Sequence, residues 1–110
     1  MEIRSDVFFA HKSSVSLPQH LVEMLENECA EVFHHAEGTA CYMDSVRWYK
    51  NSVSEIVEFY EFLDGLDSYD YVAIEACQGY PEIVSGDAGA WHSNPWQASK
   101  NRTGIQFTQE

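Results

Sequence analysis

The chain has 110 residues, of which 18 are Asp or Glu and 6 are Lys or Arg, so its formal net charge is −12 at pH 7. This length predicts one domain over residues 1–110, and the 45% hydrophobic and 14% aromatic content favours a packed core over a disordered acidic segment. Such a charge repels nucleic acid and anionic membranes and attracts basic surfaces, which argues against direct nucleic-acid or membrane binding.

The three cysteines, Cys29, Cys41 and Cys77, are widely spaced, and the sequence contains no C-x-x-C pair. An odd number of cysteines without close spacing does not fit a disulfide framework. The first residues contain no apolar run long enough for a signal peptide or a membrane span. We therefore expect a cytoplasmic protein with reduced thiols.

Residues 2–10 alternate apolar side chains between two faces and predict a strand. A helix is expected to begin at Ser16, which forms an S-x-x-Q capping box with Gln19, and to end near His34 and His35. The apolar stripe of this expected helix consists of Leu21, Val22, Leu25, Cys29, Val32 and Phe33.

Residues 39–49 are strand-like and are expected to bend at Asp44-Ser45. A second helix follows, with a capping box at Ser52-Val53-Ser54-Glu55 and a C-terminal cap at Gly65. Its expected buried stripe consists of Val53, Ile56, Phe59, Tyr60 and Leu63.

Two strands are expected in the last third of the chain. Residues 69–77 predict a strand with Tyr71, Ala73 and Glu75 on one face, and residues 104–109 predict a final strand. Between them, residues 78–100 show no clear periodicity and are expected to form a long loop. Loops of this length in a compact domain are usually functional or mobile.

These elements follow the order β-α-β-α-β-β. They predict an α+β fold, a two-layer sandwich in which two helices cover one face of a mainly antiparallel sheet of four or five strands. A true hairpin at the Asp44-Ser45 bend would change the order to β-α-β-β-α-β, which is the ferredoxin-like arrangement.

No group of residues predicts a catalytic, metal or cofactor site. His34, His35, Cys41 and Cys77 lack the short ligand spacings of zinc sites. No glycine-rich loop leads into a helix that could bind phosphate. We therefore expect a non-enzymatic protein that needs no metal or cofactor.

The most directional feature of the sequence is its acidity. Between Val53 and Ser99 there is no Lys or Arg, but there are nine Asp or Glu residues. Six of these recur at every third residue and are expected to form a negatively charged platform for a basic partner. A solvated helix face without a partner is the alternative. The six residues are Glu55, Glu58, Glu61, Asp64, Asp67 and Asp70.

Within residues 78–100, Trp91 and Trp96 lie among Gly, Ser and Asn residues. Trp is a common anchor of protein interfaces, so these two indoles are expected to supply apolar contact with the partner. The alternative is that they fold back over the sheet face that the two helices leave open.

Three segments resemble a pattern in small uncharacterised phage and prophage proteins: YMDSVRWY at residues 42–49, residues 54–63, and DYVAI at residues 70–74. This resemblance implies a fold and no activity. The size, acidity and α+β build are also similar to those of small phage-encoded inhibitors of host defence, including anti-CRISPR proteins and DNA mimics. That similarity implies a target in the host cytoplasm and assigns no functional residue.

Together these observations predict a protein that blocks a basic, nucleic-acid-binding surface of a host protein through the acidic platform. A second hypothesis is a homodimeric interaction or regulatory domain that pairs through the aromatic loop or a sheet edge. A third is a small enzyme or ligand-binding domain in which residues 78–100 form a lid near Cys77, His92 and Glu75.

Overall fold

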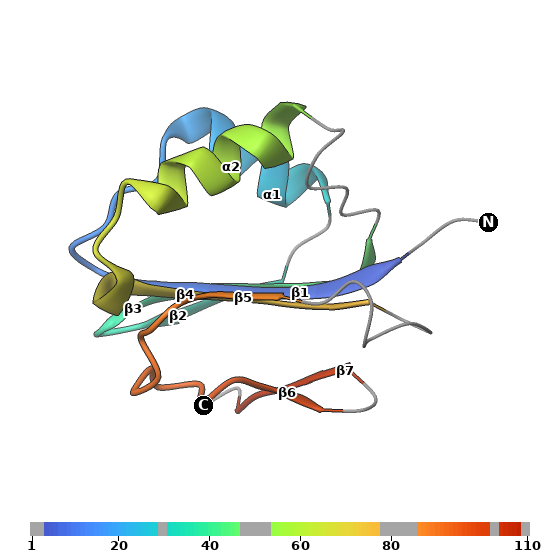
Figure 1. Ribbon diagram of the computed structural model, residues 1–110. Coiled ribbons are helices and arrows are strands. Elements are labelled where there is room, and N and C mark those ends of the chain that lie inside the picture. The colour runs from blue at the N-terminus through green and yellow to red at the C-terminus, as the bar shows by residue number, and fades with distance from the viewer. Residues whose placement is uncertain (1–3, 29–30, 47–53, 78–85, 102–103, 109–110) are drawn as a thin grey trace.

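The computed structural model describes residues 4–28, 31–46, 54–77, 86–101 and 104–108 (Figure 1). The helices and strands within these residues are β1 (Ser5–Lys12), α1 (Gln19–Asn27), β2 (Glu31–His35), β3 (Gly38–Val46), α2 (Ser54–Asp64), the short 3-10 helix η1 (Ser68–Asp70), β4 (Tyr71–Cys77), β5 (Gly86–Gly89), β6 (Ser99–Asn101) and β7 (Gly104–Gln106).

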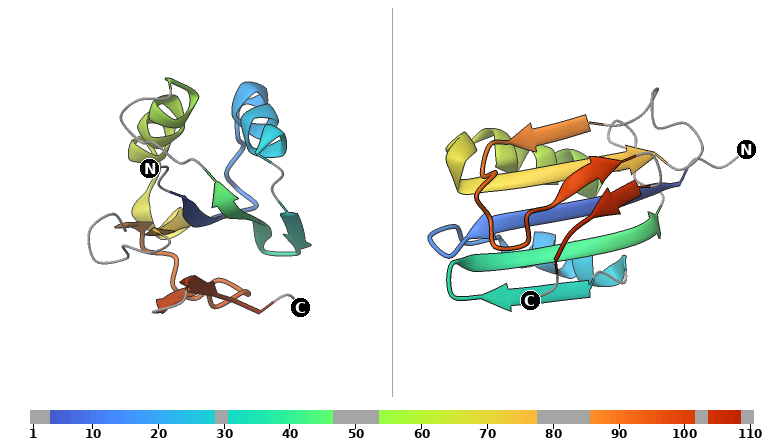
Figure 2. Two further views of the ribbon diagram at one scale, coloured as in Figure 1. Left: turned by 90° about the vertical axis from the view of Figure 1, so that its right-hand side faces the viewer. Right: turned by 90° about the horizontal axis from the view of Figure 1, so that it is seen from below.

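The main sheet has five antiparallel strands in the order β2-β3-β1-β4-β5. Both helices lie side by side on one face of this sheet (Figures 1 and 2). The predicted α+β class, with two helices on one face of a five-stranded antiparallel sheet, is therefore confirmed. From β1 to β4 the regular elements follow the order β-α-β-β-α-β, with β1 inserted between β3 and β4, which is the ferredoxin-like arrangement.

The first helix is shorter than predicted, because its expected second half forms a strand. Helix α1 ends at Asn27, and β2 pairs with β3 in a register that places Val32 opposite Cys41 and Phe33 opposite Ala40. The apolar pair Val32-Phe33 fits a helical stripe and a strand equally well, and pairing with β3 decides between them. The predicted capping box at Ser16 is also wrong, because Pro18 is the N-cap and makes no side-chain hydrogen bond.

The expected bend at Asp44-Ser45 is a β-bulge within β3 and not a hairpin. Asp44 and Ser45 together lie opposite Asp6 of β1, where the register between the two strands shifts. Ser45 has a φ of 57°, and its backbone N–H donates to Oδ1 of Asp6 over 3.0 Å. The hairpin of this region instead joins β2 to β3, through the two residues between His35 and Gly38.

The second helix and the following strand agree with the prediction. Ile56, Phe59 and Leu63 of α2 are buried, and the backbone N–H of Gly65 donates to the carbonyl of Phe62 over 3.1 Å. The capping residues Ser52 and Val53 lie outside the described part of the chain. In β4, Tyr71 and Ala73 join the core beneath the helices, whereas Val72 and Ile74 join a second core on the opposite face.

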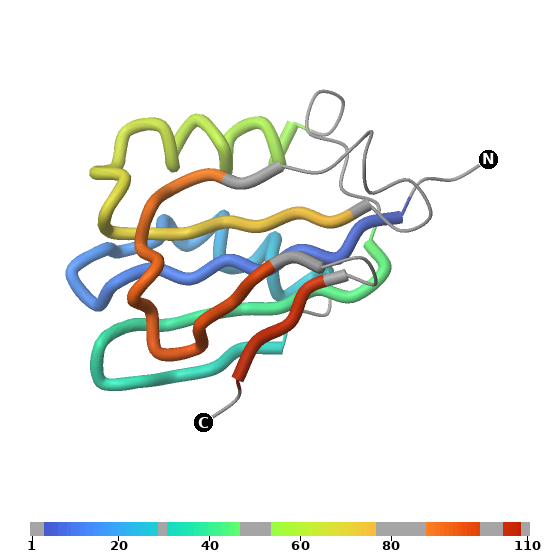
Figure 3. Tube along the Cα trace, turned by 60° about the horizontal axis from the view of Figure 1, so that its bottom comes forward, coloured from blue at the N-terminus to red at the C-terminus, as the bar shows by residue number. Residues whose placement is uncertain are grey.

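This second core forms a third layer on the sheet face that the helices leave open, which confirms the alternative stated above for the two indoles. Strands β6 and β7 pair with each other, and not with the main sheet, and lie on the face opposite the helices (Figure 1). The segment that leaves β5 crosses the sheet before the chain turns into β6 (Figure 3). The strand expected at residues 104–109 therefore belongs to a separate hairpin, and the loop expected at residues 78–100 contains β5 and the first two residues of β6. The buried members of the second core are Phe8, Ala10, Ala40, Val72, Ile74, Trp91 and Trp96.

Candidate functional site

The acidic residues of α2 lie on its solvent-facing side. The buried side chains of this helix are Ile56, Phe59 and Leu63. Its exposed acidic side chains are Glu55, Glu58, Glu61 and Asp64. Successive residues of an α-helix are rotated by about 100°, so each step of three residues turns back by about 60°. Glu58 and Glu61 therefore face away from the sheet, and Glu55 and Asp64 lie on the two flanks of the helix.

Helix α1 adds two exposed carboxylates, Glu23 and Glu26, to the same layer. Neither helix contains a Lys or Arg. Sequence reasoning missed these two residues, although residues 13–46 also contain no Lys or Arg, a signal that could have found them. We call the acidic residues of the two helices the acidic helix surface: Glu23, Glu26, Glu55, Glu58, Glu61 and Asp64.

The two halves of the acidic helix surface meet at a contact between a histidine and a carboxylate. Nε2 of His20 in α1 lies 3.1 Å from Oε2 of Glu58 in α2, and both side chains are exposed. Exposed pairs of this kind add little stability, so the packing of the two helices does not depend on this contact.

The remaining two residues of the predicted platform make local contacts at the end of the layer. Oδ1 of Asp67 accepts a hydrogen bond from the backbone N–H of Tyr69 over 2.9 Å and so caps η1. Oδ1 of Asp70 lies 3.7 Å from Nζ of Lys12 in β1. The structure therefore groups four of the six predicted residues on α2 and places Asp67 and Asp70 where a structural contact already uses their charge.

The negative charge of α2 affects the pKa of a side chain on the neighbouring strand β4. Burial raises the pKa of the Tyr71 hydroxyl above its ordinary value, and the negative charge of Asp64 raises it further. Tyr71 therefore stays protonated and neutral at physiological pH. The negative charge at this end of the layer belongs to the carboxylates alone.

The structure places both tryptophans in the protein core. Trp91 is 5% exposed and Trp96 is 1% exposed, and their rings meet edge to face with centroids 6.2 Å apart. This arrangement corrects the expectation that the aromatic loop presents them to a partner. A sheet with helices on one face leaves its other face open, and the indoles cover it.

Two of the residues proposed for a lid-covered site, Glu75 and His92, lie on opposite sides of the sheet. Glu75 is buried and belongs to the helix-facing side of β4, because it alternates with Ala76 and shares the face of Tyr71 and Ala73. The segment that contains His92 lies on the opposite side of the sheet, over the second core. Where the structure describes that segment, Trp91 and Trp96 pack in the aromatic second core beneath it.

The adjacent histidines His34 and His35 lie on strand β2 and point to opposite faces of the sheet. His35 packs against Trp96, with ring centroids 6.1 Å apart, whereas His34 lines a cavity on the helix-facing side. Within the described ranges, no three His, Cys, Asp or Glu residues are grouped so that they could hold a metal ion.

Comparisons with protein-family models, with curated proteins and with solved structures found no match to this chain, so no residue role is carried over from a relative. No helix in the described part of the chain is long and apolar enough to cross a membrane.

Proposed function

We propose that the protein is a non-enzymatic binding protein whose acidic helix surface covers a basic, nucleic-acid-binding surface of a partner protein. One observation carries this proposal: two adjacent helices present six exposed carboxylates, and neither helix contains a Lys or Arg. The folded domain holds these charges on one layer, so a partner would meet them as a single negative surface.

The arrangement costs stability, which favours a functional origin. Like charges three or four residues apart on a helix lie about 5–6 Å from each other and destabilise it by roughly 0.2–0.5 kcal/mol per pair. On α2, Glu55, Glu58, Glu61 and Asp64 form a continuous series of such pairs. A protein that needed only solubility could reach the same net charge with carboxylates spread over its whole surface and interspersed with Lys and Arg.

The surface suits fast and selective association with a basic partner. A dense negative field speeds the encounter with a positively charged surface and aligns the two proteins. It also repels nucleic acid, so the protein would compete with nucleic acid for the partner and would not bind nucleic acid itself. Because both indoles are buried, the proposal rests on the acidic helix surface and not on Trp91 or Trp96.

A capture experiment with paired variants tests this proposal. The tagged full chain is incubated with a bacterial lysate, and bound proteins are eluted with duplex DNA and identified. The same capture uses Glu58→Lys/Glu61→Lys, and the matched control Glu31→Lys/Glu37→Lys changes net charge equally on exposed residues outside the helix layer. We expect DNA to elute a basic nucleic-acid-binding protein from the wild type. The control variant should retain the same protein, whereas Glu58→Lys/Glu61→Lys should not. Equal retention by wild type and both variants would contradict the proposal.

A second candidate function is self-association through the edge strand β2. This strand forms one edge of the main sheet, and Val32 on it is 47% exposed. Antiparallel pairing of two copies centred on Phe33 would place Glu31 of one copy opposite His35 of the other, which is a favourable cross-strand pair. Sedimentation velocity from low to high micromolar concentration tests it. This function would be supported if the wild type forms a dimer that dissociates in Val32→Lys and persists in Ser99→Lys. A monomer at every concentration would exclude it.

A further inference from the structure

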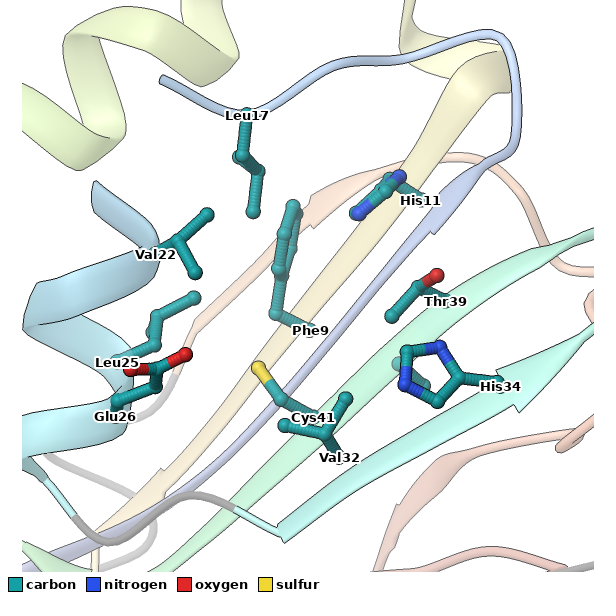
Figure 4. Close-up of a pocket in the computed structure, with 11 residues that line it drawn as sticks. Phe9, His11, Leu17, Val22, Leu25, Glu26, Val32, His34, Thr39 and Cys41 are labelled. Carbon is teal, nitrogen blue, oxygen red and sulfur yellow. The ribbon is translucent and has the colours of Figure 1, made fainter. Parts of the chain in front are cut away.

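A cavity of about 500 Å³ lies between α1 and the sheet, toward the β2 edge (Figure 4). Its volume falls in the range of about 300–1,000 Å³ that is typical of small-molecule sites. The cavity lies on the side of α1 that faces the sheet, and Glu26 is the one residue that it shares with the acidic helix surface. The four carboxylates of α2 do not line it.

The middle of the cavity is apolar. Strand register places Phe9, Cys41 and Val32 side by side across β1, β3 and β2. Leu25 of α1 faces them from the helix side (Figure 4). Burial raises the pKa of the Cys41 thiol to about 12, so the thiol stays protonated and behaves as part of the apolar lining.

A row of polar side chains follows two residues further along the same strands. Register places His11, Thr39 and His34 side by side, and all three line the cavity. Nδ1 of His11 lies 2.9 Å from the carbonyl oxygen of Lys12. A carbonyl only accepts hydrogen bonds, so Nδ1 is the donor in this contact, and Nε2 is an acceptor in the form of the ring that carries one proton.

The charge of the lining has one sign. Glu26 of α1 lies at the cavity beside Leu25, across from the polar row (Figure 4). None of the lining residues, all of them within the described ranges, is Lys or Arg. The whole chain carries a net charge of −12, so its field raises the local concentration of cations and lowers that of anions.

We propose that this cavity binds a small organic cation, an amine with an apolar or aromatic body. The body would lie over Phe9 and Cys41, and the ammonium group would pair with Glu26. Nε2 of His11, in the singly protonated form of the ring, and the hydroxyl of Thr39 offer further acceptors for its N–H groups. An organic anion fits poorly, because the lining contains a carboxylate and no permanent positive charge.

Three ligands of nearly equal shape test the charge preference. The probes are 2-phenylethylamine, 2-phenylethanol and phenylacetate, each titrated into the ¹⁵N-labelled full chain at pH 8, above the usual range of histidine pKa values. We expect saturable shifts of the amide signals of Phe9, Leu25 and Cys41 with the amine, at a Kd of about 10 mM or tighter. The alcohol should bind roughly three- to tenfold more weakly, and phenylacetate most weakly of the three.

A matched pair of variants separates a specific site from general attraction to an acidic protein. Glu26→Gln should lower the affinity for 2-phenylethylamine to that for 2-phenylethanol. Glu23→Gln removes the same charge from an exposed position of α1 that does not line the cavity, and it should change the affinity less than twofold. Both residues are exposed, so both variants should retain the wild-type spectrum. Any of three results would overturn the proposal. These are shifts of the cavity amides that do not saturate, tighter binding of phenylacetate than of the amine, and equal losses of affinity in the two variants.

Discussion

Oδ1 of Asn94 accepts a hydrogen bond from the backbone N–H of Trp96 over 3.1 Å, and Nδ2 of Asn94 donates to the carbonyl of Trp91 over 2.8 Å. Asn94 itself is only 2% exposed. One buried amide therefore spans the turn between the two indoles and holds both of them over the sheet. The third layer of the protein depends on this polar residue as well as on apolar burial.

We expect Asn94→Ala to lower the free energy of unfolding by about 1–3 kcal/mol, because it leaves buried backbone groups of Trp91 and Trp96 without their partner. Urea unfolding measures the change. The control is Ser93→Ala, an exposed neighbour, which should change stability by less than about 0.5 kcal/mol. An unchanged stability in Asn94→Ala would show that the turn does not need the amide.

Truncation of Trp96 tests whether the second core is a true core. Trp96 is 1% exposed and packs against Phe8 with ring centroids 6.4 Å apart. We expect Trp96→Ala to lower the free energy of unfolding by about 3–5 kcal/mol. The milder Trp96→Phe should leave association with a basic partner unchanged. A small loss of stability together with lost association would instead make Trp96 a partner anchor.

Reversing one charge of the acidic helix surface should affect stability and binding in opposite directions. Glu61 lies one turn from both Glu58 and Asp64, so Glu61→Lys replaces two repulsions with two attractions. We expect a gain of roughly 0.3–1 kcal/mol in the free energy of unfolding and slower association with the partner. Thermal unfolding checks the first effect. A loss of stability would show that the carboxylates of α2 are not under mutual repulsion.

The β-bulge contains an acidic pair with its own pH dependence. The pKa of Asp44 is raised above its ordinary value near 3.8, first by a side-chain hydrogen bond with Asp6, then by partial burial and by the charges of Asp6 and Glu31. The folded state thus holds this proton more tightly than the unfolded chain does. The contribution of Asp44 to stability is therefore present at low pH and is lost as pH rises from about 3.8 through the raised pKa.

Asp44→Asn imitates the protonated carboxyl at every pH. We expect it to stabilise the protein at pH 7, by less than about 1 kcal/mol because the position is exposed, and to have no effect at pH 3. Urea unfolding at both pH values measures this difference. Glu37→Gln, which removes an exposed charge from the β2–β3 turn, is the control for the loss of one negative charge. A stability gain of equal size at pH 3 would contradict the proposed acidic pair.

The sequence predicted best the elements whose signals are local. Helix α2 has an apolar stripe and Gly65 directly after its end, and β4 alternates without interruption, so both were found close to their true bounds. The bend at Asp44-Ser45 was also found, although its geometry depends on the strand opposite it. Local patterns cannot distinguish a bulge from a hairpin.

Prediction from the sequence failed where the structure of a segment depends on residues far away in the chain. The segment from Glu31 to His35 is a strand because β3 pairs with it. For the tryptophans the sequence offered two alternatives, exposure to a partner or burial, and the uncovered face of the sheet decides for burial. The cavity depends on lateral register, since His11, Thr39 and His34 become neighbours only when three strands align. The acidic row on α2 was recognised. The lack of Lys and Arg over residues 13–46 pointed to α1 as well, but only the fold shows that the two helices lie side by side (Figure 2).

The rate of association between the protein and a captured basic partner tests the central claim most directly. It is measured by stopped flow from 50 to 500 mM salt for wild type, for Glu58→Lys/Glu61→Lys and for Glu31→Lys/Glu37→Lys. The account predicts that the wild-type rate falls steeply with salt, and that the helix variant is the slower of the two variants at low salt. Equal rates for the two variants, or a wild-type rate independent of salt, would contradict the assignment of the acidic helix surface as the binding site.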